Sequence, residues 1–118
     1  MLLDSNTIIY ISKDLSISKR FEGEELYTSI ISKIEVLGFH KITKQDKIDT
    51  ENFLNSIQIL DFNNEIAEQS IRLRQKKNMS LGDSIIASTA LLHKIPLVTA
   101  NVDDFKWIKE LKIINPLK

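Results

Sequence analysis

The sequence predicts an α/β fold, a three-layer α/β/α sandwich with a central parallel sheet of four or five strands. Short apolar and β-branched runs alternate along the chain with longer segments whose apolar residues recur at helical spacing. Only three Gly and two Pro interrupt the 118 residues, so most of the chain is expected to be regular structure. The alternation of strands and helices is typical of parallel sheets with helical crossovers.

The predicted strands are short and separated by helices. The first is the apolar pair at residues 2–3, and the second is the β-branched run LYTSII. IQILDF and IPLVTA have the same character, and KIIN near the end is a candidate edge strand. The expected strands span residues 2–3, 26–31, 57–62, 95–100 and 112–115.

The predicted helices differ in the width of their apolar faces. SKIEVLGFHK carries Ile34 and Leu37 at helical spacing, whereas KQDKIDTENFLNS has a sparse apolar side. NNEIAEQSIRLRQKK places Ile66, Ser70 and Leu73 on one face. GDSIIASTALLHK is apolar almost all round and rich in small residues, so it is expected to lie buried against the sheet. The expected helices span residues 5–12, 32–41, 44–56, 63–77, 82–94 and 103–111.

The composition indicates one globular domain over residues 1–118. Hydrophobic residues make up 42% and charged residues 27%, and 16 basic residues balance 16 acidic ones, so net charge indicates neither a nucleic-acid nor a membrane partner. The segment 13–25 is expected to be a short acidic connection. No apolar run approaches the roughly 20 residues that span a bilayer, and MLLDSN lacks the basic start of a signal peptide. A cytoplasmic protein is therefore expected.

Several kinds of chemistry are excluded by the residues that the chain lacks. It has no Cys, which rules out disulfides, thiolate catalysis and Cys-based zinc sites. Its three Gly residues form neither GxGxxG nor GxxxxGK[ST], the loops that bind phosphates. The GxSxG motif of serine hydrolases is also missing. His40 and His93 are interpreted as structural residues, the second on the buried helix.

Four carboxylates fall where a parallel sheet gathers side chains. Asp4 directly follows the first predicted strand, and Asp103 and Asp104 follow the fourth. Glu35 lies about one turn into the helix after the second strand, and Asp83 begins the buried helix. Ligands of such sheets bind beyond the carboxyl ends of the strands. Asp4, Glu35, Asp83 and Asp104 are therefore expected at one mouth, with Asp103 as a solvated neighbour.

Each acid also has an ordinary interpretation. Asp4 and Asp83 are well placed to cap helix N-termini, while acids in turns and on helices are usually solvated. Convergence, in contrast, requires a cation, because two carboxylates about 5 Å apart repel by roughly 3 kcal/mol at an effective dielectric near 20. Oxygen ligands alone select Mg²⁺ or Mn²⁺. Such a site suggests phosphodiester chemistry, in which the metal activates water and stabilises the leaving oxygen.

The acids lie in motifs that resemble those of the PIN domain family of ribonucleases, in particular the VapC-type toxins of bacterial and archaeal toxin–antitoxin pairs. LLDSN is similar to the opening strand and Asp-x-Asn of that family, and IISKIEVLGF to its second acidic motif. GDSIIASTAL and LVTANVDDF are similar to the third and fourth motifs. The matches cover nearly the whole chain and occur in the family's order.

The resemblance implies a metal-dependent endoribonuclease, the toxin of a toxin–antitoxin pair, that leaves 5′-phosphate and 3′-hydroxyl ends. The implied catalytic residues, which would hold one or two Mg²⁺ or Mn²⁺ ions, are Asp4, Glu35, Asp83 and Asp104. The implied orienting residues beside them are Asn6, Thr99 and Asn101. An RNA substrate, a small cognate antitoxin bound near the acidic mouth and a homodimer are implied as well.

A basic stretch without any acid precedes the third motif. Its charged residues are Arg72, Arg74, Lys76 and Lys77. They are candidates for contacts with RNA phosphates near Asp83. The alternative is a solvated helix end that the helix dipole stabilises.

Rival functions share the predicted fold. A two-component receiver needs a phospho-accepting Asp after the third strand, which Asp61 would supply. It also needs two acids after the first strand and a Lys before a late Pro, and the chain has neither. A catalytically inactive, PIN-like protein-binding scaffold would keep the fold without the chemistry, although all four acids are present. A phosphatase of the haloacid dehalogenase type is excluded because its DxD motif requires an acid at Asn6.

Overall fold

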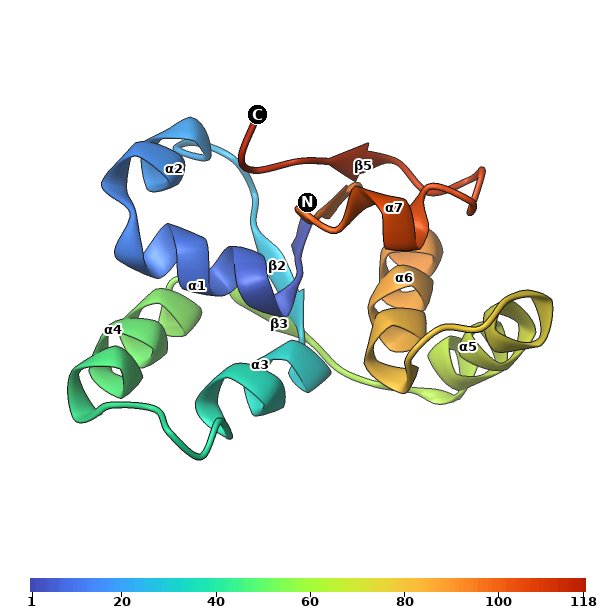
Figure 1. Ribbon diagram of the computed structural model, residues 1–118, viewed down its shortest axis with the longest axis horizontal. Coiled ribbons are helices and arrows are strands. Elements are labelled where there is room, and N and C mark those ends of the chain that lie inside the picture. The colour runs from blue at the N-terminus through green and yellow to red at the C-terminus, as the bar shows by residue number, and fades with distance from the viewer.

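The computed structural model describes every residue from Met1 to Lys118. The chain forms five strands and seven helices (Figure 1). The strands are β1 (Leu2–Leu3), β2 (Tyr27–Ser29), β3 (Gln58–Leu60), β4 (Leu97–Val98) and β5 (Ile113–Ile114). The helices are α1 (Ser5–Lys13), α2 (Leu15–Arg20), α3 (Ile30–Leu37), α4 (Lys44–Asn55), α5 (Asn64–Lys76), α6 (Leu81–His93) and α7 (Val102–Phe105).

All five strands are parallel and lie in the order β3-β2-β1-β4-β5. The central strand is β1, in which Leu3 lies beside Thr28 of β2 on one side and beside Val98 of β4 on the other. The predicted fold class is confirmed, as is the edge position of the fifth strand. Because all strands run the same way, the residues that follow β1, β2 and β4 lie at one rim of the sheet.

The strand order also excludes the receiver interpretation. In the flavodoxin-like order of receivers, 2-1-3-4-5, the third strand lies next to the first. Here β3 lies at the edge, beyond β2, so that Asp61 after β3 is two strands away from Asp4 after β1. The acids that a receiver needs in contact therefore follow strands that are not neighbours.

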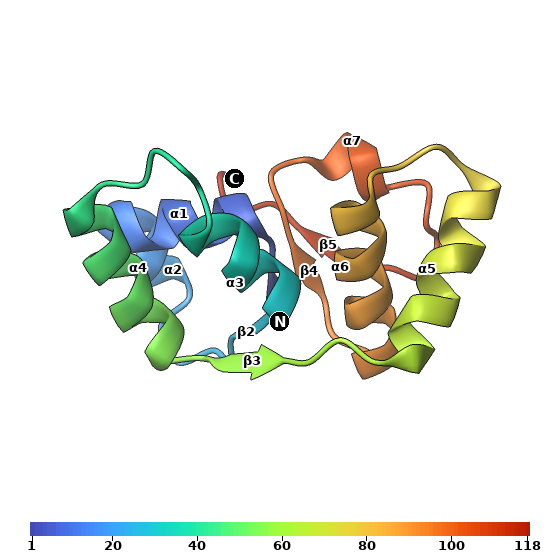
Figure 2. The ribbon, with the colours of Figure 1, turned by 90° about the horizontal axis from the view of Figure 1, so that it is seen from below.

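Helices cover both faces of the sheet (Figure 2). Leu2 and Leu97 belong to a hydrophobic cluster that includes side chains of α5, α6 and α7. Leu3 and Val98 belong to a second cluster, with side chains of α1, α3 and α4. All four are 0% exposed, so each two-residue strand is anchored by burial on both of its faces. This double burial is the reason why these strands have continuous apolar runs rather than alternating ones.

The predicted buried helix corresponds to α6, in which the whole segment from Ser84 to Ala90 is buried. Its polar side chains are satisfied within the layer. The hydroxyl of Ser70 on α5 lies 3.1 Å from that of Ser88, and the Thr89 hydroxyl donates to the Ile85 carbonyl at 2.6 Å. Small hydroxyl side chains therefore let α5 and α6 pack closely without leaving polar groups unpaired.

Two differences from the predicted elements precede α4. The segment 13–25 is not merely a connection but contains α2, whose N-terminus Asp14 caps by accepting from the Ser16 backbone N–H at 2.9 Å. The sequence LSISKR gave no indication of it because Ser is a poor helix former. The second strand is also shorter than predicted, since the Ser29 side chain caps α3 and the helix begins at Ile30.

The helix predicted over 103–111 is likewise shorter, and α7 ends at Phe105. Phe105, Ile108 and Leu111 are all buried, and this three-residue spacing led to the prediction of a longer helix. The backbone instead continues in consecutive turns, in which Ile108 N–H donates to the Phe105 carbonyl and Leu111 N–H to the Ile108 carbonyl. Turns that repeat every three residues place buried side chains on one face of the chain, as a helix would.

Both histidines are exposed, and neither lines the hollows that contain the site carboxylates. His93 is the last residue of α6, directly before Lys94, which ends the helix at a left-handed φ of 56°. None of the seven helices combines the length and the apolar character needed to cross a membrane.

We predict that Leu97→Ala lowers the free energy of unfolding by about 2 to 5 kcal/mol, because it leaves a cavity beside the central strand. Urea unfolding followed by circular dichroism measures the loss. Leu92→Ala is the matched control, since Leu92 is 38% exposed on α6. Its truncation is expected to cost less than about 1 kcal/mol. Equal losses in both variants would contradict the assignment of Leu97 to the core.

Candidate functional site

Asp4 lies at the carboxyl end of β1 and caps α1. Its Oδ1 accepts from the Thr7 backbone N–H at 2.8 Å, and its own backbone N–H donates to the Val98 carbonyl at 3.2 Å. The Thr7 hydroxyl donates to the same carbonyl at 3.0 Å. These bonds tie the first turn of α1 to the end of β4. Asp4 is only 6% exposed, so its carboxylate is fixed at the rim of the sheet.

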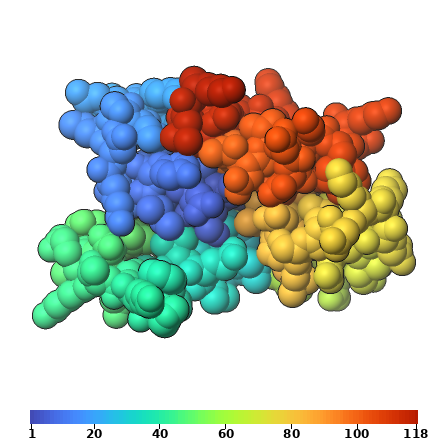
Figure 3. All heavy atoms as spheres, viewed as in Figure 1, coloured from blue at the N-terminus to red at the C-terminus, as the bar shows by residue number.

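Glu35 on α3 lies close to the residues next to Asp4 and Asp83 in the sequence. Its Oε1 accepts from the Ser5 hydroxyl at 3.0 Å, and Ser5 directly follows Asp4. A Cβ placed on Gly82 would lie 3.5 Å from its Oε2, and Gly82 directly precedes Asp83. The Glu35 carboxylate therefore lies between the start of α1 and the start of α6. In the space-filling view, α1 in blue, α3 in teal, α6 in gold and α7 in orange meet on one face (Figure 3).

Asp83 lies in the first turn of α6, but it does not cap the helix. The cap is Ser80, whose Oγ accepts from the Asp83 backbone N–H at 3.0 Å. This corrects the alternative interpretation of Asp83 as an N-cap. The spacing of Ser80 and Asp83 is that of a capping box, a pattern visible in SLGD that could have identified Ser80 from the sequence.

The four acids share one electrostatic environment. Burial raises the pKa of Asp83 above its ordinary value, a hydrogen bond from the Ser80 hydroxyl opposes this increase, and the charges of Asp104, Asp4 and Glu35 increase the pKa further. Each of the other three acids is therefore near enough to make ionisation of Asp83 less favourable. The result is an excess of negative charge at the rim.

Asp104 and its neighbour Asp103 differ in their partners. Asp104 and Asp83 line one hollow of about 190 Å³ at the end of α5. The residues that line it are Lys77, Asn78, Met79, Ser80, Asp83, Asp103 and Asp104. Asp103 forms an exposed ion pair with Lys106 at 2.9 Å, and the hydrogen bond from Lys106 lowers its pKa. Asp103 thus has its own cation, whereas Asp104 forms no ion pair.

The polar residues predicted to orient the carboxylates occupy the same rim but bond to other groups. Thr99 is buried, and its hydroxyl accepts from the Asn101 backbone N–H at 3.1 Å. Asn6 and Asn101 are exposed, and neither side chain hydrogen-bonds to a site carboxylate. The bonds to the acids come from Ser5 and Ser80 instead. Ser5 has no sequence signal beyond its position next to Asp4.

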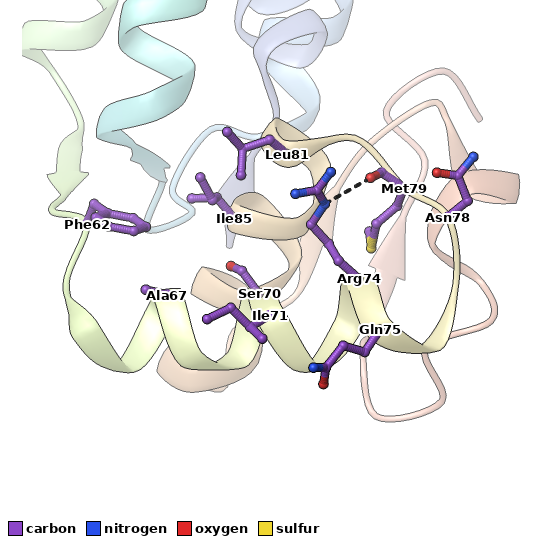
Figure 4. Close-up of a pocket in the computed structure, with 10 residues that line it drawn as sticks. All are labelled: Phe62, Ala67, Ser70, Ile71, Arg74, Gln75, Asn78, Met79, Leu81 and Ile85. Carbon is purple, nitrogen blue, oxygen red and sulfur yellow. Dashed lines mark hydrogen bonds between the residues drawn. The ribbon is translucent and has the colours of Figure 1, made fainter.

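Two further hollows flank the rim. A groove of about 400 Å³ between α1, α3 and α4 contains Glu35. It is lined by Ser5, Asn6, Ile9, Lys13, Glu35, Val36, Phe39, Ile42, Asp46 and Thr50. A mostly apolar pocket of about 480 Å³ between α5 and α6 contains none of the four acids (Figure 4). It is lined by Phe62, Ala67, Ser70, Ile71, Arg74, Gln75, Asn78, Met79, Leu81 and Ile85.

The basic residues near the end of α5 are held in different ways. The Arg72 guanidinium donates to the Gln69 side chain at 2.7 Å. That of Arg74 donates to the Met79 carbonyl at 3.3 Å, the bond drawn in Figure 4. Lys77 lies over the ring of Trp107 and lines the hollow that contains Asp83 and Asp104. The basic stretch is therefore not a single surface.

The donors at the rim fit a hard divalent cation. The side chains there offer carboxylate and hydroxyl oxygens, the ligands that Mg²⁺ and Mn²⁺ prefer. No group of three or more His, Asp or Glu side chains is close enough to hold an ion directly. Mg²⁺ usually keeps several waters and binds through one or two carboxylates. The spacing at the rim is thus compatible with an ion held partly through water.

Comparison with known proteins identifies the family. The PIN domain family profile matches residues 1–111, so the chain belongs to the PIN domain family. A toxin–antitoxin complex from Klebsiella pneumoniae contains a similar chain, with 30% identity, 98% of this chain and 96% of that chain covered, and a TM-score of 0.81. The family resemblance of the four motifs, including that to VapC-type toxins, is confirmed.

Other solved structures have the same fold. VapBC-1 from nontypeable Haemophilus influenzae contains a chain 25% identical, with coverage of 99% of this chain and 98% of that one and a TM-score of 0.81. DNA-bound VapBC from Salmonella typhimurium gives 22% identity, coverage of 98% and 96%, and a TM-score of 0.82, a likeness of fold alone. A search of curated proteins found no match.

The raised pKa of Asp83 predicts a pH dependence for the metal-free protein. The native state binds more protons than the unfolded state between the unfolded pKa near 3.8 and the higher native value, so this residue lowers stability as pH rises through that range. Asp83→Asn in EDTA is therefore expected to melt at a higher temperature than wild type at neutral pH. The gain should be below about 1 kcal/mol, because the carboxylate is partly exposed.

Differential scanning calorimetry from acidic to neutral pH measures this difference. It should shrink as pH falls toward the unfolded pKa of Asp83. Asp103→Asn is the matched control and should lose stability at neutral pH, because Lys106 lowers the pKa of Asp103. A neutral-pH melting temperature below that of wild type for Asp83→Asn would contradict the electrostatic account.

Proposed function

We propose that this chain is the toxin of a toxin–antitoxin pair and acts in the cytoplasm as a divalent-metal-dependent endoribonuclease. The observation that carries the proposal is the meeting of carboxylates from the ends of β1 and β4 and from α3 and α6 at one rim, beside a cationic side chain. Membership of the PIN domain family and the likeness to toxin–antitoxin complexes support it. The inactive-scaffold alternative has no observation in its favour, because none of the four acids is replaced or neutralised by an ion pair.

In this proposal the metal-holding and catalytic residues are Asp4, Glu35, Asp83 and Asp104, which bind one or two Mg²⁺ or Mn²⁺ ions directly and through water. A bound ion supplies activation of the attacking water and neutralisation of the phosphate charge. The chain's own residues fix the acids. The Ser5 hydroxyl orients Glu35, the Ser80 hydroxyl bonds Asp83, and the cap to Thr7 fixes Asp4.

The remaining proposed residues surround these acids. Asn6, Thr99 and Asn101 are proposed to complete the hydrogen bonds around ligands and bound waters once an ion is present. The candidates for contacts with RNA phosphates are Arg72, Arg74, Lys76 and Lys77, because neutralisation of phosphates supplies most of the sequence-independent affinity. Lys77, which lies just beyond the end of α5, is the one that the homodimer proposed below leaves free. The expected products carry 5′-phosphate and 3′-hydroxyl ends.

We propose that the antitoxin binds in the groove between α1, α3 and α4. Phe39 is exposed there, and Ile42 and Ile9 add apolar surface. Within the groove, Lys13 and Asp46 form an ion pair at 3.5 Å, which leaves the Glu35 carboxylate without a cation. Apolar side chains beside an unpaired acid fit a peptide that carries both apolar residues and a basic side chain.

We also propose that the chain forms a homodimer through the pocket between α5 and α6. Three large apolar side chains around this pocket are exposed, Phe62 at 45%, Ile71 at 50% and Leu81 at 60%. In Figure 4 they lie around one opening. Contiguous apolar surface of this kind marks an interaction site.

The charges along α5 favour a second copy as the partner. Its first half carries Glu65 and Glu68, and its second half carries Arg72, Arg74 and Lys76. A two-fold axis brings the same patch of both subunits together, so a stable interface must be complementary to itself. Two antiparallel α5 helices would pair the acidic half of each with the basic half of the other.

The first test of the nuclease function is the melting temperature in EDTA and in millimolar Mn²⁺ or Mg²⁺. A metal present at about 100 times its Kd should add about 2.7 kcal/mol, a shift of several degrees for a domain of this size. Asp83→Asn should abolish this shift. Asp103→Asn, which alters the acid already paired with Lys106, should keep it. No shift in wild type would contradict the metal site.

The activity itself is measured on total cellular RNA, because this substrate presents transfer, ribosomal and messenger RNA together. Wild-type protein with Mg²⁺ should create new 5′-phosphate ends, detected by ligation of an adaptor and sequencing. Asp83→Asn should lower the yield at least about 100-fold, since the metal supplies several kcal/mol of charge stabilisation. New ends that persist in EDTA or in Asp83→Asn would show a contaminating nuclease and contradict the assignment.

If the chain forms the proposed homodimer, a charged residue placed in the interface should lower the mass measured in solution. Wild type should elute with a mass near twice 13.6 kDa by size-exclusion chromatography with light scattering. Ile71→Glu should shift the population to monomer, because it buries an unpaired charge in an apolar contact. Ile48→Glu, at an exposed isoleucine of α4 on the other side of the sheet, is the control and should stay dimeric. A monomeric wild type would overturn the proposal.

A further inference from the structure

We propose that Lys77, held against Trp107, binds the phosphate that the carboxylate rim cleaves, and that the hollow beside Asp83 and Asp104 is a phosphate subsite. The inference rests on the proposed nuclease function and specifies how that site holds its substrate. It distinguishes Lys77, just beyond the end of α5, from the basic residues within that helix, which the proposed homodimer pairs with the acidic half of the other copy. It also assigns Trp107, which the sequence motifs do not include, as a positioning residue.

The hollow is lined by charged residues of both signs. Asp83, Asp103 and Asp104 contribute carboxylates, and Lys77 is the one cationic residue that lines it. Its volume of about 190 Å³ corresponds to roughly six water volumes. A phosphate group seated there would meet the Lys77 ammonium group, and an ion held by Asp83 and Asp104 would supply further neutralisation of its charge. Lys is a point charge that commonly serves in phosphate binding.

Trp107 connects Lys77 to Asp104. The Lys77 Nζ lies 5.7 Å from the centroid of the indole ring, within the range of a cation–π contact. The indole Nε1 donates to the Asp104 backbone carbonyl at 3.1 Å. One side chain therefore contacts both the cation and the residue that carries the acid. Trp107 therefore positions Lys77 relative to Asp104.

The charge of Lys77 is not used by another protein group. Ion pairs form at Lys13, Lys47 and Lys106, and none involves Lys77, although three aspartates line the same hollow. The ammonium group rests on the indole face instead of pairing with Asp83 or Asp104. A cation held near carboxylates but not paired with them is available to an added anion, and the substrate of the proposed reaction supplies one.

The test is binding of a fluorescein-labelled, mixed-sequence single-stranded RNA, followed by fluorescence anisotropy in Mn²⁺ over a series of KCl concentrations. Lys77→Gln should weaken binding roughly tenfold, because it removes one charged hydrogen bond. It should also flatten the slope of log K against log [KCl] by about 0.7. Lys109→Gln is the matched control, an exposed lysine two residues from Trp107, and should leave the slope unchanged. A denaturing gel verifies that the RNA stays intact.

Two variants of Trp107 test whether its aromatic ring positions Lys77 or only fills space. Trp107→Leu should behave like Lys77→Gln, whereas Trp107→Phe keeps an aromatic face and should bind within about twofold of wild type. The double variant Lys77→Gln/Trp107→Leu should bind no more weakly than Lys77→Gln alone, because the two residues act as one unit. Additive losses would overturn the role of Trp107.

Four outcomes decide the proposal. An unchanged slope in Lys77→Gln would overturn it. An equal loss for Lys77→Gln in Mn²⁺ and in EDTA would place the contact away from the metal and overturn it as well. All Lys77 and Trp107 variants should retain the Mn²⁺-dependent melting shift of wild type. If that shift is present while Lys77→Gln binds like wild type, the subsite fails alone; if wild type has no shift, the nuclease function fails too.

Discussion

The rim of carboxylates depends on the parallel pairing of β1 with both β2 and β4. Leu2 and Leu3 are the whole of this strand, and they face opposite hydrophobic layers. A slip of the register by one residue would exchange their faces and would displace Asp4, which directly follows. Because the strand is so short, burial of two leucines fixes both the centre of the sheet and the first acid of the site.

Bringing the four carboxylates together costs electrostatic free energy, and the N-termini of helices partly offset that cost. Asp4 caps α1, while Asp83 and Asp104 lie in the first turns of α6 and α7. Partial positive charge at helix N-termini stabilises anions there. The same N-termini repel a cation, so several carboxylates are needed to reverse the local sign. Glu35, in the last turn of α3, has no such compensation and takes a hydrogen bond from Ser5 instead. In the metal-free protein the raised pKa of Asp83 marks a carboxylate of the rim whose ionisation lowers stability.

The features that the sequence predicted are those set by burial and chain order. Leucine pairs and β-branched runs predicted the strands, and the position of Asp4 and Asp104 directly after two of them predicted a shared rim. Features that depend on spatial neighbours were missed. Nothing in the sequence indicates that Ser5 bonds to Glu35, and a helix and a series of turns bury Phe105 and Ile108 at the same spacing. The place of β3 at the sheet edge is also set by packing rather than by order along the chain.

The two sides of the rim differ in a way that bears on inhibition. On the α3 side, the groove combines apolar and polar side chains and its lysine is paired with Asp46, so Glu35 leaves an excess of negative charge. On the α5 side, the hollow contains Lys77, whose charge is free to meet a phosphate. Under the proposed function, a basic antitoxin segment and an RNA phosphate would therefore enter from opposite sides. Both would depend on the same carboxylates. A basic side chain of the antitoxin would take the place of the metal ion, whereas an RNA phosphate would bind to that ion. Inhibition would then require no overlap between their binding surfaces beyond the rim itself.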